Sequence, residues 1–177
     1  YSFRGSSTNY YFPLDFTVGG AVASFGRRLE WPDDFFRVMW SAKFMQKEYE
    51  GSQADIDNYI GGLQKTRGIS LSQVLSRDSR NRAEFPTNGS TFILENTYSG
   101  GFLGGNENFQ KHMLTLDWFT PTISKFILYN SVKLGVIKTL NVGDDVQSFV
   151  PFDERFIMGG NGIPYGNALR GYPDNAI

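Results

Sequence analysis

The sequence contains no cysteine, a single histidine and almost no net charge. The absence of cysteine excludes disulfide bonds, thiol nucleophiles and zinc–thiolate sites. The 17 basic and 18 acidic residues leave a net charge of −1, which gives no electrostatic basis for a nucleic-acid partner. Composition alone therefore argues against several classes of enzyme and binding protein.

Long apolar runs are also missing. The longest stretch without Asp, Glu, Lys or Arg extends from Phe156 to Leu169, and it is interrupted by Pro164 and four glycines. A transmembrane helix needs roughly 20 consecutive apolar residues, so none is predicted. His112 has no spaced metal-ligating neighbours, and there is no nucleophile elbow or phosphate-binding loop. The sequence therefore predicts no enzyme activity, no cofactor and no metal site.

Aromatic residues and glycine, by contrast, are abundant. Aromatic residues make up 16% of the chain, and 20 of its 177 residues are glycine, a composition typical of strands and turns. From Phe36 onward, apolar and polar side chains alternate with the period of a β-strand. One register contains Phe36, Val38, Trp40, Ala42 and Phe44, and the other contains Arg37, Met39, Ser41, Lys43, Met45 and Lys47.

The same alternation, with less contrast, recurs along the chain. We predict six strands at roughly 16–28, 35–48, 60–76, 90–99, 109–119 and 125–139. Their connections are too short for the crossover helices of a parallel sheet, so the strands should be antiparallel. Turn residues mark 30–34, 81–89 and 120–122, and the other connections are longer or rich in glycine. This arrangement predicts an all-β barrel with turns on one rim and long loops on the other.

Alternation alone leaves two interpretations open, a soluble β-sandwich or lipocalin-like barrel and a transmembrane β-barrel. In the membrane barrel the apolar register meets lipid and the polar register lines the lumen. Trp31, Tyr98 and Trp118 lie near predicted strand ends, where membrane barrels carry aromatic girdles. These aromatic residues favour the membrane barrel.

Six strands are too few for a closed single-chain membrane barrel, since known bacterial barrels start at eight strands and an open edge cannot lie in lipid. Either strands are missing from this count, or copies of the chain close the barrel together, or the chain is part of a larger barrel. We predict residues 140–177 to be a long loop, which favours a part of a larger barrel.

Three motifs point to a known family. Residues 26–36 (GRRLEWPDDFF) resemble a strand–turn–strand of the bacterial surface antigen family of outer-membrane barrels. Residues 77–81 (RDSRN) and 85–90 (FPTNGS) resemble the family's periplasmic turn. Residues 156–160 (FIMGG) and 169–172 (LRGY) are similar to the signature of its sixth extracellular loop, although Leu169 stands where the family usually has Val or Ile. The order and spacing of the motifs also match, and the resemblance covers about residues 14–175.

The resemblance implies a fold and a function. It implies an incomplete set of about six strands plus the sixth extracellular loop of a sixteen-stranded barrel in the bacterial outer membrane. The family barrel is preceded by periplasmic POTRA domains and ends in further strands, neither of which we expect within residues 1–177. Family barrels fold and insert other outer-membrane barrels by opening between their first and last strands and pairing with an incoming strand. The implied partners are outer-membrane lipid, nascent β-barrel proteins, and accessory lipoproteins bound through the POTRA domains.

The resemblance also implies two sets of site residues. In the family, the arginine at the tip of the sixth loop latches the loop inside the lumen, and here that residue is Arg170. A guanidinium has five donors in a rigid fork and suits such a latch. The loop-latch motif comprises Leu169, Arg170, Gly171 and Tyr172 with Gly159 and Gly160. The periplasmic turn cluster comprises Asp78, Arg80 and Asn81, for which we expect a structural role in capping the turn and pairing charges.

Two other functions remain open. A two-partner secretion or autotransporter-assembly transporter would share both the barrel and the loop motif. A passive, porin-like barrel would lack a loop folded into the lumen. The turn with the sequence WPDD favours the assembly branch, by resemblance.

Overall fold

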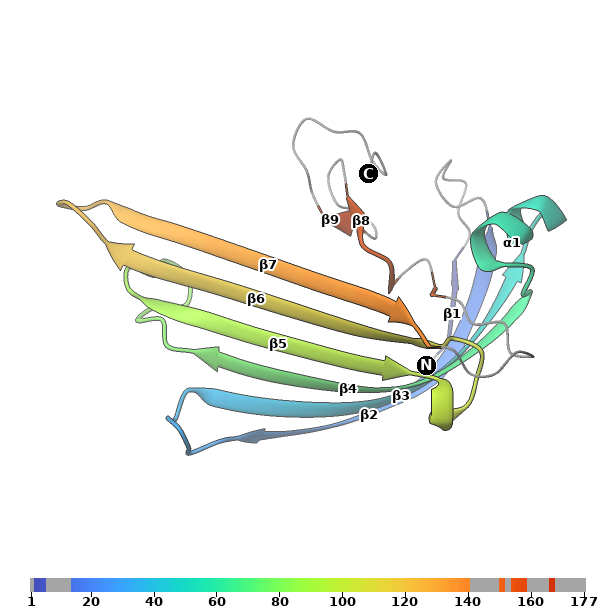
Figure 1. The fold of residues 1–177 in the computed structure, drawn as a ribbon, viewed down its shortest axis with the longest axis horizontal. Coiled ribbons are helices and arrows are strands. Elements are labelled where there is room, and N and C mark those ends of the chain that lie inside the picture. The colour runs from blue at the N-terminus through green and yellow to red at the C-terminus, as the bar shows by residue number, and fades with distance from the viewer. Residues whose placement is uncertain (1, 6–13, 141–149, 152–153, 159–165, 168–177) are drawn as a thin grey trace.

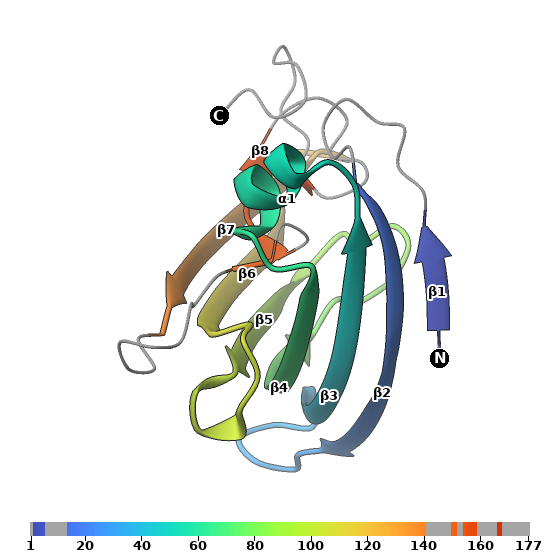
Figure 2. The same cartoon turned by 90° about the vertical axis from the view of Figure 1, so that its right-hand side faces the viewer.

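The computed structural model describes residues 2–5, 14–140, 150–151, 154–158 and 166–167. Seven antiparallel strands form one sheet in which the order of the strands is their order along the chain (Figure 1). The strands are β1 (Ser2–Gly5), β2 (Asp15–Arg28), β3 (Phe36–Glu50), β4 (Lys65–Asp78), β5 (Gly89–Ser99), β6 (Phe109–Pro121) and β7 (Ile127–Thr139). The all-β antiparallel prediction is confirmed, and the sheet curves as part of a barrel wall (Figure 2).

The predicted strand at 60–76 begins too early. Its first residue, Ile60, ends a helix, α1 (Gln53–Ile60), and the strand starts at Lys65. Ser52 caps the helix, because its side chain accepts a hydrogen bond from the Asp55 amide. Gly61 ends the helix with φ at 64°, a left-handed conformation that glycine adopts without a Cβ penalty. No helix in the described part of the chain has the length and apolar character needed to cross a membrane.

Four shorter elements were not predicted. The short strand β1 pairs with the first part of β2, next to Phe16 and Gly19. A single 3-10 turn, η1 (Gly101–Leu103), lies between β5 and β6. Within the region predicted as loop 140–177, β8 (Ile157–Met158) and β9 (Gly166–Asn167) form a two-residue parallel pair.

The connections between strands lie at two opposite rims of the sheet (Figure 1). We name the end that carries residues 29–35, 79–88 and 122–126 the turn rim, and the end that carries α1 and η1 the loop rim. The 79–88 connection is as long as the one at 100–108, so length alone does not separate the rims. Of the predicted girdle residues, Trp31 and Trp118 lie towards the turn rim and Tyr98 lies towards the loop rim.

The two faces of the sheet differ in chemistry. Residues 154–158 lie inside the curve of the sheet, against the register that contains Lys43 and Lys111 (Figure 2). That register is therefore the concave face, and the other is the convex face. Pairing across the strands places large apolar side chains on the convex face. Exposed members of this convex set are Phe25, Trp40, Phe44, Leu71, Trp118, Leu128, Leu134 and Val136. An apolar convex face and a polar concave face are the arrangement expected of a barrel in lipid.

Few apolar side chains are buried within the described residues, and those that form a cluster lie at the loop rim. Ile56 and Ile60 of α1 pack against Leu14 and Tyr49. Phe16 and Leu63 border this cluster. The helix thus has a local packing role, while most of the apolar surface of the sheet faces outward.

Candidate functional site

A buried ion pair lies on the concave face near the loop rim. The Lys47 ammonium is 3.5 Å from Glu107 Oε1, and the two side chains are only 6% and 7% exposed. The Thr66 hydroxyl donates a hydrogen bond of 2.8 Å to the same carboxylate oxygen. A Cβ atom at Gly68 would collide with the Glu107 carboxylate, so glycine at this position makes room for it. Together these residues hold the 100–108 connection against the wall.

A small polar cavity of about 60 Å³ adjoins this ion pair. Its lining includes hydroxyl groups from β4 and β5, namely Ser70, Ser72, Thr97 and Ser99, together with Lys43 and Glu154. These hydroxyl and charged groups are of the kind that line the polar interior of a membrane barrel. The concave register therefore has the chemistry of a barrel lumen.

The segment that follows β7 returns to this wall at Glu154. Lys111 Nζ lies 3.0 Å from Glu154 Oε2 and donates a second hydrogen bond of 2.9 Å to the Glu154 carbonyl. Lys43 Nζ, on β3, lies 3.9 Å from the other carboxylate oxygen. Glu154 therefore joins two strands that are not neighbours in the sheet.

An aromatic contact reinforces this attachment. Lys111 Nζ lies 5.2 Å from the centroid of the Phe156 ring, within the range of a cation–π interaction. The Phe156 ring also lies directly over Gly135 of β7, where a Cβ atom would be 2.6 Å from the ring. We call Glu154 and Phe156, with Lys43, Lys111 and Gly135, the loop root. It fixes residues 154–156, within the region predicted as loop 140–177, to three strands of the concave face.

The predicted loop-latch residues lie beyond the loop root in the sequence. Gly159, Gly160, Leu169, Arg170, Gly171 and Tyr172 all lie outside the described residues. Their role in latching the loop stays a prediction.

The periplasmic turn cluster divides into two local arrangements at the turn rim. Arg80 donates two hydrogen bonds to the Asp78 carboxylate, of 2.9 Å from Nε and 2.7 Å from Nη2. Asn81 bonds elsewhere: its side chain accepts from the amides of Thr87 and Asn88 and donates to the Thr87 hydroxyl. Asp78 and Arg80 thus form a bidentate pair, while Asn81 braces the 79–88 connection.

A second ion pair lies beside this cluster. Arg77 contacts Asp33 of the 29–35 connection at 2.8 Å and lies 5.5 Å from the centroid of the Phe35 ring. Burial raises the pKa of Asp33. Hydrogen bonds from Arg77 and from the Phe35 amide, together with the charge of Arg77, outweigh that effect, so the net pKa lies below its ordinary value. This contact joins the 29–35 connection to the end of β4.

Sequence analysis did not identify Glu154, Glu107 or the aromatic contact of Phe156. The alternation did assign Lys43 and Lys47 to the polar register, and in a membrane barrel that register predicts positive charge facing the lumen. Their carboxylate partners come from connections, and strand periodicity does not predict how a connection folds. In the described part of the chain, no group of three His, Asp or Glu side chains could hold a metal ion.

Comparison with known proteins gives two matches. The model of the Omp85 superfamily domain matches residues 3–177. The outer membrane protein assembly factor BamA of Nitratidesulfovibrio vulgaris (strain Hildenborough) is 29% identical over 128 residues. The aligned region is 70% of this chain and 15% of that relative, so the chain spans a small part of the length of the protein it matches.

Proposed function

The chain belongs to the Omp85 superfamily, and from this membership we propose that it forms part of a β-barrel factor that folds and inserts other β-barrel proteins into the membrane. Its location is the bacterial outer membrane. The proposed partners are outer-membrane lipid along the convex face and nascent β-barrel proteins. Accessory lipoproteins, bound through periplasmic domains of the complete protein, are a further proposed set of partners.

The observation that carries this proposal is the loop root. A carboxylate shared by Lys43 and Lys111, and a ring seated on Gly135, hold the segment after β7 inside the curve of the sheet. We expect a passive, porin-like barrel to lack a loop folded into the lumen, so this attachment favours the assembly factor over that alternative. An inward-folded segment supports a barrel whose interior is organised around the sixth loop, as the resemblance to the bacterial surface antigen family implies.

Within this proposal, Arg170 is the distal latch and the loop root is the proximal one. The guanidinium of Arg170 would bind acidic and aromatic groups on the inner wall. In the complete protein, Arg170→Ala should lower the assembly of outer-membrane proteins or the stability of the barrel. Wild-type assembly and stability in that variant would contradict the latch.

The test of the function is a reconstituted insertion assay. The complete protein is placed in lipid vesicles, a urea-unfolded outer-membrane barrel is added, and its folding is followed by resistance to protease. We expect faster folding than in empty vesicles, and slower folding when the vesicles contain the Glu154→Ala variant. The Glu48→Ala variant is the control, since Glu48 forms an exposed pair with Lys65 on the other face of the sheet.

The competing function is secretion through a two-partner or autotransporter-assembly transporter. That barrel would carry the same loop, so the geometry does not separate the two. Vesicles that release a secreted passenger and leave the rate of barrel folding unchanged would favour the transporter.

A further inference from the structure

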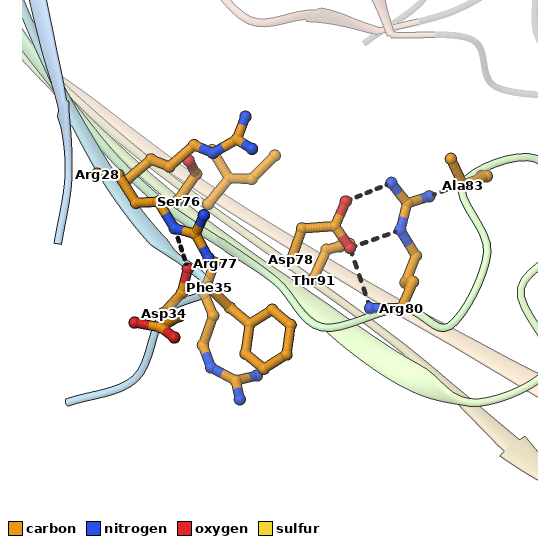
Figure 3. Close-up of a pocket in the computed structure, with 11 residues that line it drawn as sticks. Arg28, Asp34, Phe35, Ser76, Arg77, Asp78, Arg80, Ala83 and Thr91 are labelled. Atoms are coloured by element: carbon orange, nitrogen blue, oxygen red, sulfur yellow. Dashed lines mark hydrogen bonds and ion pairs between the residues drawn. The ribbon is translucent and has the colours of Figure 1, made fainter. Parts of the chain in front are cut away.

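A cavity of about 450 Å³ lies at the turn rim, and Figure 3 draws the residues that line it. Most of its lining residues on strands belong to the concave register. Its volume falls within the range of ordinary ligand sites. Four arginines line it, namely Arg28, Arg37, Arg77 and Arg80, together with the acidic residues Asp34 and Asp78. The side chain of Arg77, however, shares the convex register of Phe36. The lining therefore carries an excess of positive charge.

Two of the four arginines are neutralised by carboxylates. Arg80 is held by Asp78, and Figure 3 shows the dashed lines that join them. Arg77 is held by Asp33, which lies outside the lining. Arg28 and Arg37 are different. Arg28 donates from Nε to the carbonyl of Asp34 at 2.6 Å, which leaves its terminal nitrogens available. In the described part of the chain, the guanidinium of Arg37 makes no hydrogen bond or close ion pair, and it acts on the Asp78 carboxylate only through its charge.

Arg28 and Arg37 lie directly opposite each other in the β2–β3 pairing. Like charges in this arrangement repel each other and destabilise a sheet. Both side chains are exposed, and both belong to the register of Lys43, the concave one. The guanidinium groups of Arg28 and Arg37 therefore lie on neighbouring strands, and both line the open cavity.

We propose that Arg28 and Arg37 bind the carboxylates of an acidic peptide segment at the turn rim. A guanidinium matches a carboxylate in a bidentate geometry, and two adjacent forks suit two acidic side chains close together in sequence. A phospholipid head group offers similar anionic oxygens. It approaches from the convex side, however, whereas both arginines lie in the concave register. The inference needs only the cavity and the register, and it holds whichever membrane protein function the barrel has.

The experiment measures binding of a fluorescent hexaglutamate peptide to the complete protein in detergent, by fluorescence anisotropy. We expect binding that weakens as salt rises from 50 to 200 mM, because charge pairs are screened. The Arg28→Gln/Arg37→Gln double variant should bind about tenfold more weakly. The matched control is Arg27→Gln, since Arg27 neighbours Arg28 on β2 but belongs to the convex register. Circular dichroism checks that each variant is folded.

Three results would overturn the proposal. The first is hexaglutamate affinity that is unchanged in the double variant. The second is an equal loss in Arg27→Gln, which would mean attraction by overall charge alone. The third is no hexaglutamate binding together with binding of glycerol 3-phosphate that depends on Arg28 and Arg37, which would assign the cavity to lipid head groups. None of these results bears on the insertion assay, so failure here is distinguishable from failure of the proposed function.

Discussion

Both ends of the concave face carry basic side chains, but these are paired with carboxylates at one end and face an open cavity at the other. At the loop rim, Lys47 is buried against Glu107, and Lys111 is held by Glu154. At the turn rim, Arg28 and Arg37 face an open cavity that contains too few carboxylates to balance them. Cations at one end thus secure the protein's own connections, while cations at the other end are available to a partner. The difference shows that the position of the carboxylates, more than the basic residues themselves, decides what a luminal cation does.

The largest expected effect is that of Glu107→Ala, which removes the carboxylate of the buried pair at the loop rim. The substitution removes the buried carboxylate that contacts Lys47 and accepts a hydrogen bond from Thr66, and breaking a buried pair of this kind costs about 3–5 kcal/mol. We expect the free energy of unfolding of the complete protein in lipid vesicles, measured with urea, to fall by this amount.

The matched control for Glu107→Ala is Glu48→Ala. The Lys65–Glu48 pair has a shorter contact, 2.8 Å, but its side chains are 66% and 47% exposed. Exposed pairs contribute about 0–1 kcal/mol, so the control should change stability little. Equal effects of the two variants would mean that burial does not distinguish the pairs.

The loop root gives the next largest expected effect. Glu154→Ala removes the acceptor of a charged hydrogen bond, worth about 1.5–3 kcal/mol. Hydrogen exchange of the amides in 154–158 should become faster, and that of β3 should change little. Gly135→Ala is a second route to the same result, because its methyl group would displace the Phe156 ring. Unchanged exchange in both variants would contradict the attachment.

At the turn rim we expect a substitution to raise the stability of the protein and not to lower it. Arg37→Gln removes the repulsion between two like charges directly opposite in the sheet, and with it the weaker attraction of Arg37 for Asp78, so we expect stability to rise by less than about 1 kcal/mol. The same substitution should weaken hexaglutamate binding. A residue with a purely structural role would not produce a gain in stability together with a loss of binding. Loss of stability in Arg37→Gln would show that the guanidinium has a structural partner.

The smallest effect concerns pH and the Asp33–Arg77 pair. Because the pKa of Asp33 is lowered by folding, its contribution to stability is present above the ordinary carboxyl pKa of 3.8 and is lost as the pH falls through the lowered value. Asp33→Asn should remove this acid dependence and leave stability at neutral pH slightly lower. Thermal unfolding followed between pH 2 and pH 7 tests it, and an identical acid profile in both proteins would contradict the assignment.

Strand positions were predictable because they depend on a local pattern. The alternation from Phe36 placed β3 within two residues at its C-terminal end, and it also assigned Lys43 and Lys47 to the inner face. Helix α1 was missed, since its apolar side is limited to a few residues. The Ser52 cap and the Gly61 end were visible in the sequence, but such signals are brief and occur in many loops.

The loop root and the arginine pair needed the structure. Glu154 contacts Lys111, which is 43 residues away in the sequence. The local alternation of apolar and polar residues does not predict that a connection folds back against the concave face. Arg28 and Arg37 were visible as basic residues, but only the register shows that they lie opposite each other. The turn cluster was predicted as one group, whereas Asn81 bonds to Thr87 and Asn88 rather than to Asp78 or Arg80.

The small apolar cluster under α1 has a consequence for temperature. Leu14, Tyr49, Ile56 and Ile60 are shielded from water by one another, so opening this cluster hydrates apolar surface and raises the heat capacity. Stabilisation of this kind weakens on cooling. The convex side chains face lipid, and the strands are joined by backbone hydrogen bonds, which depend far less on water. Cold should therefore loosen the helix and the loop rim first, while the wall of the barrel stays intact.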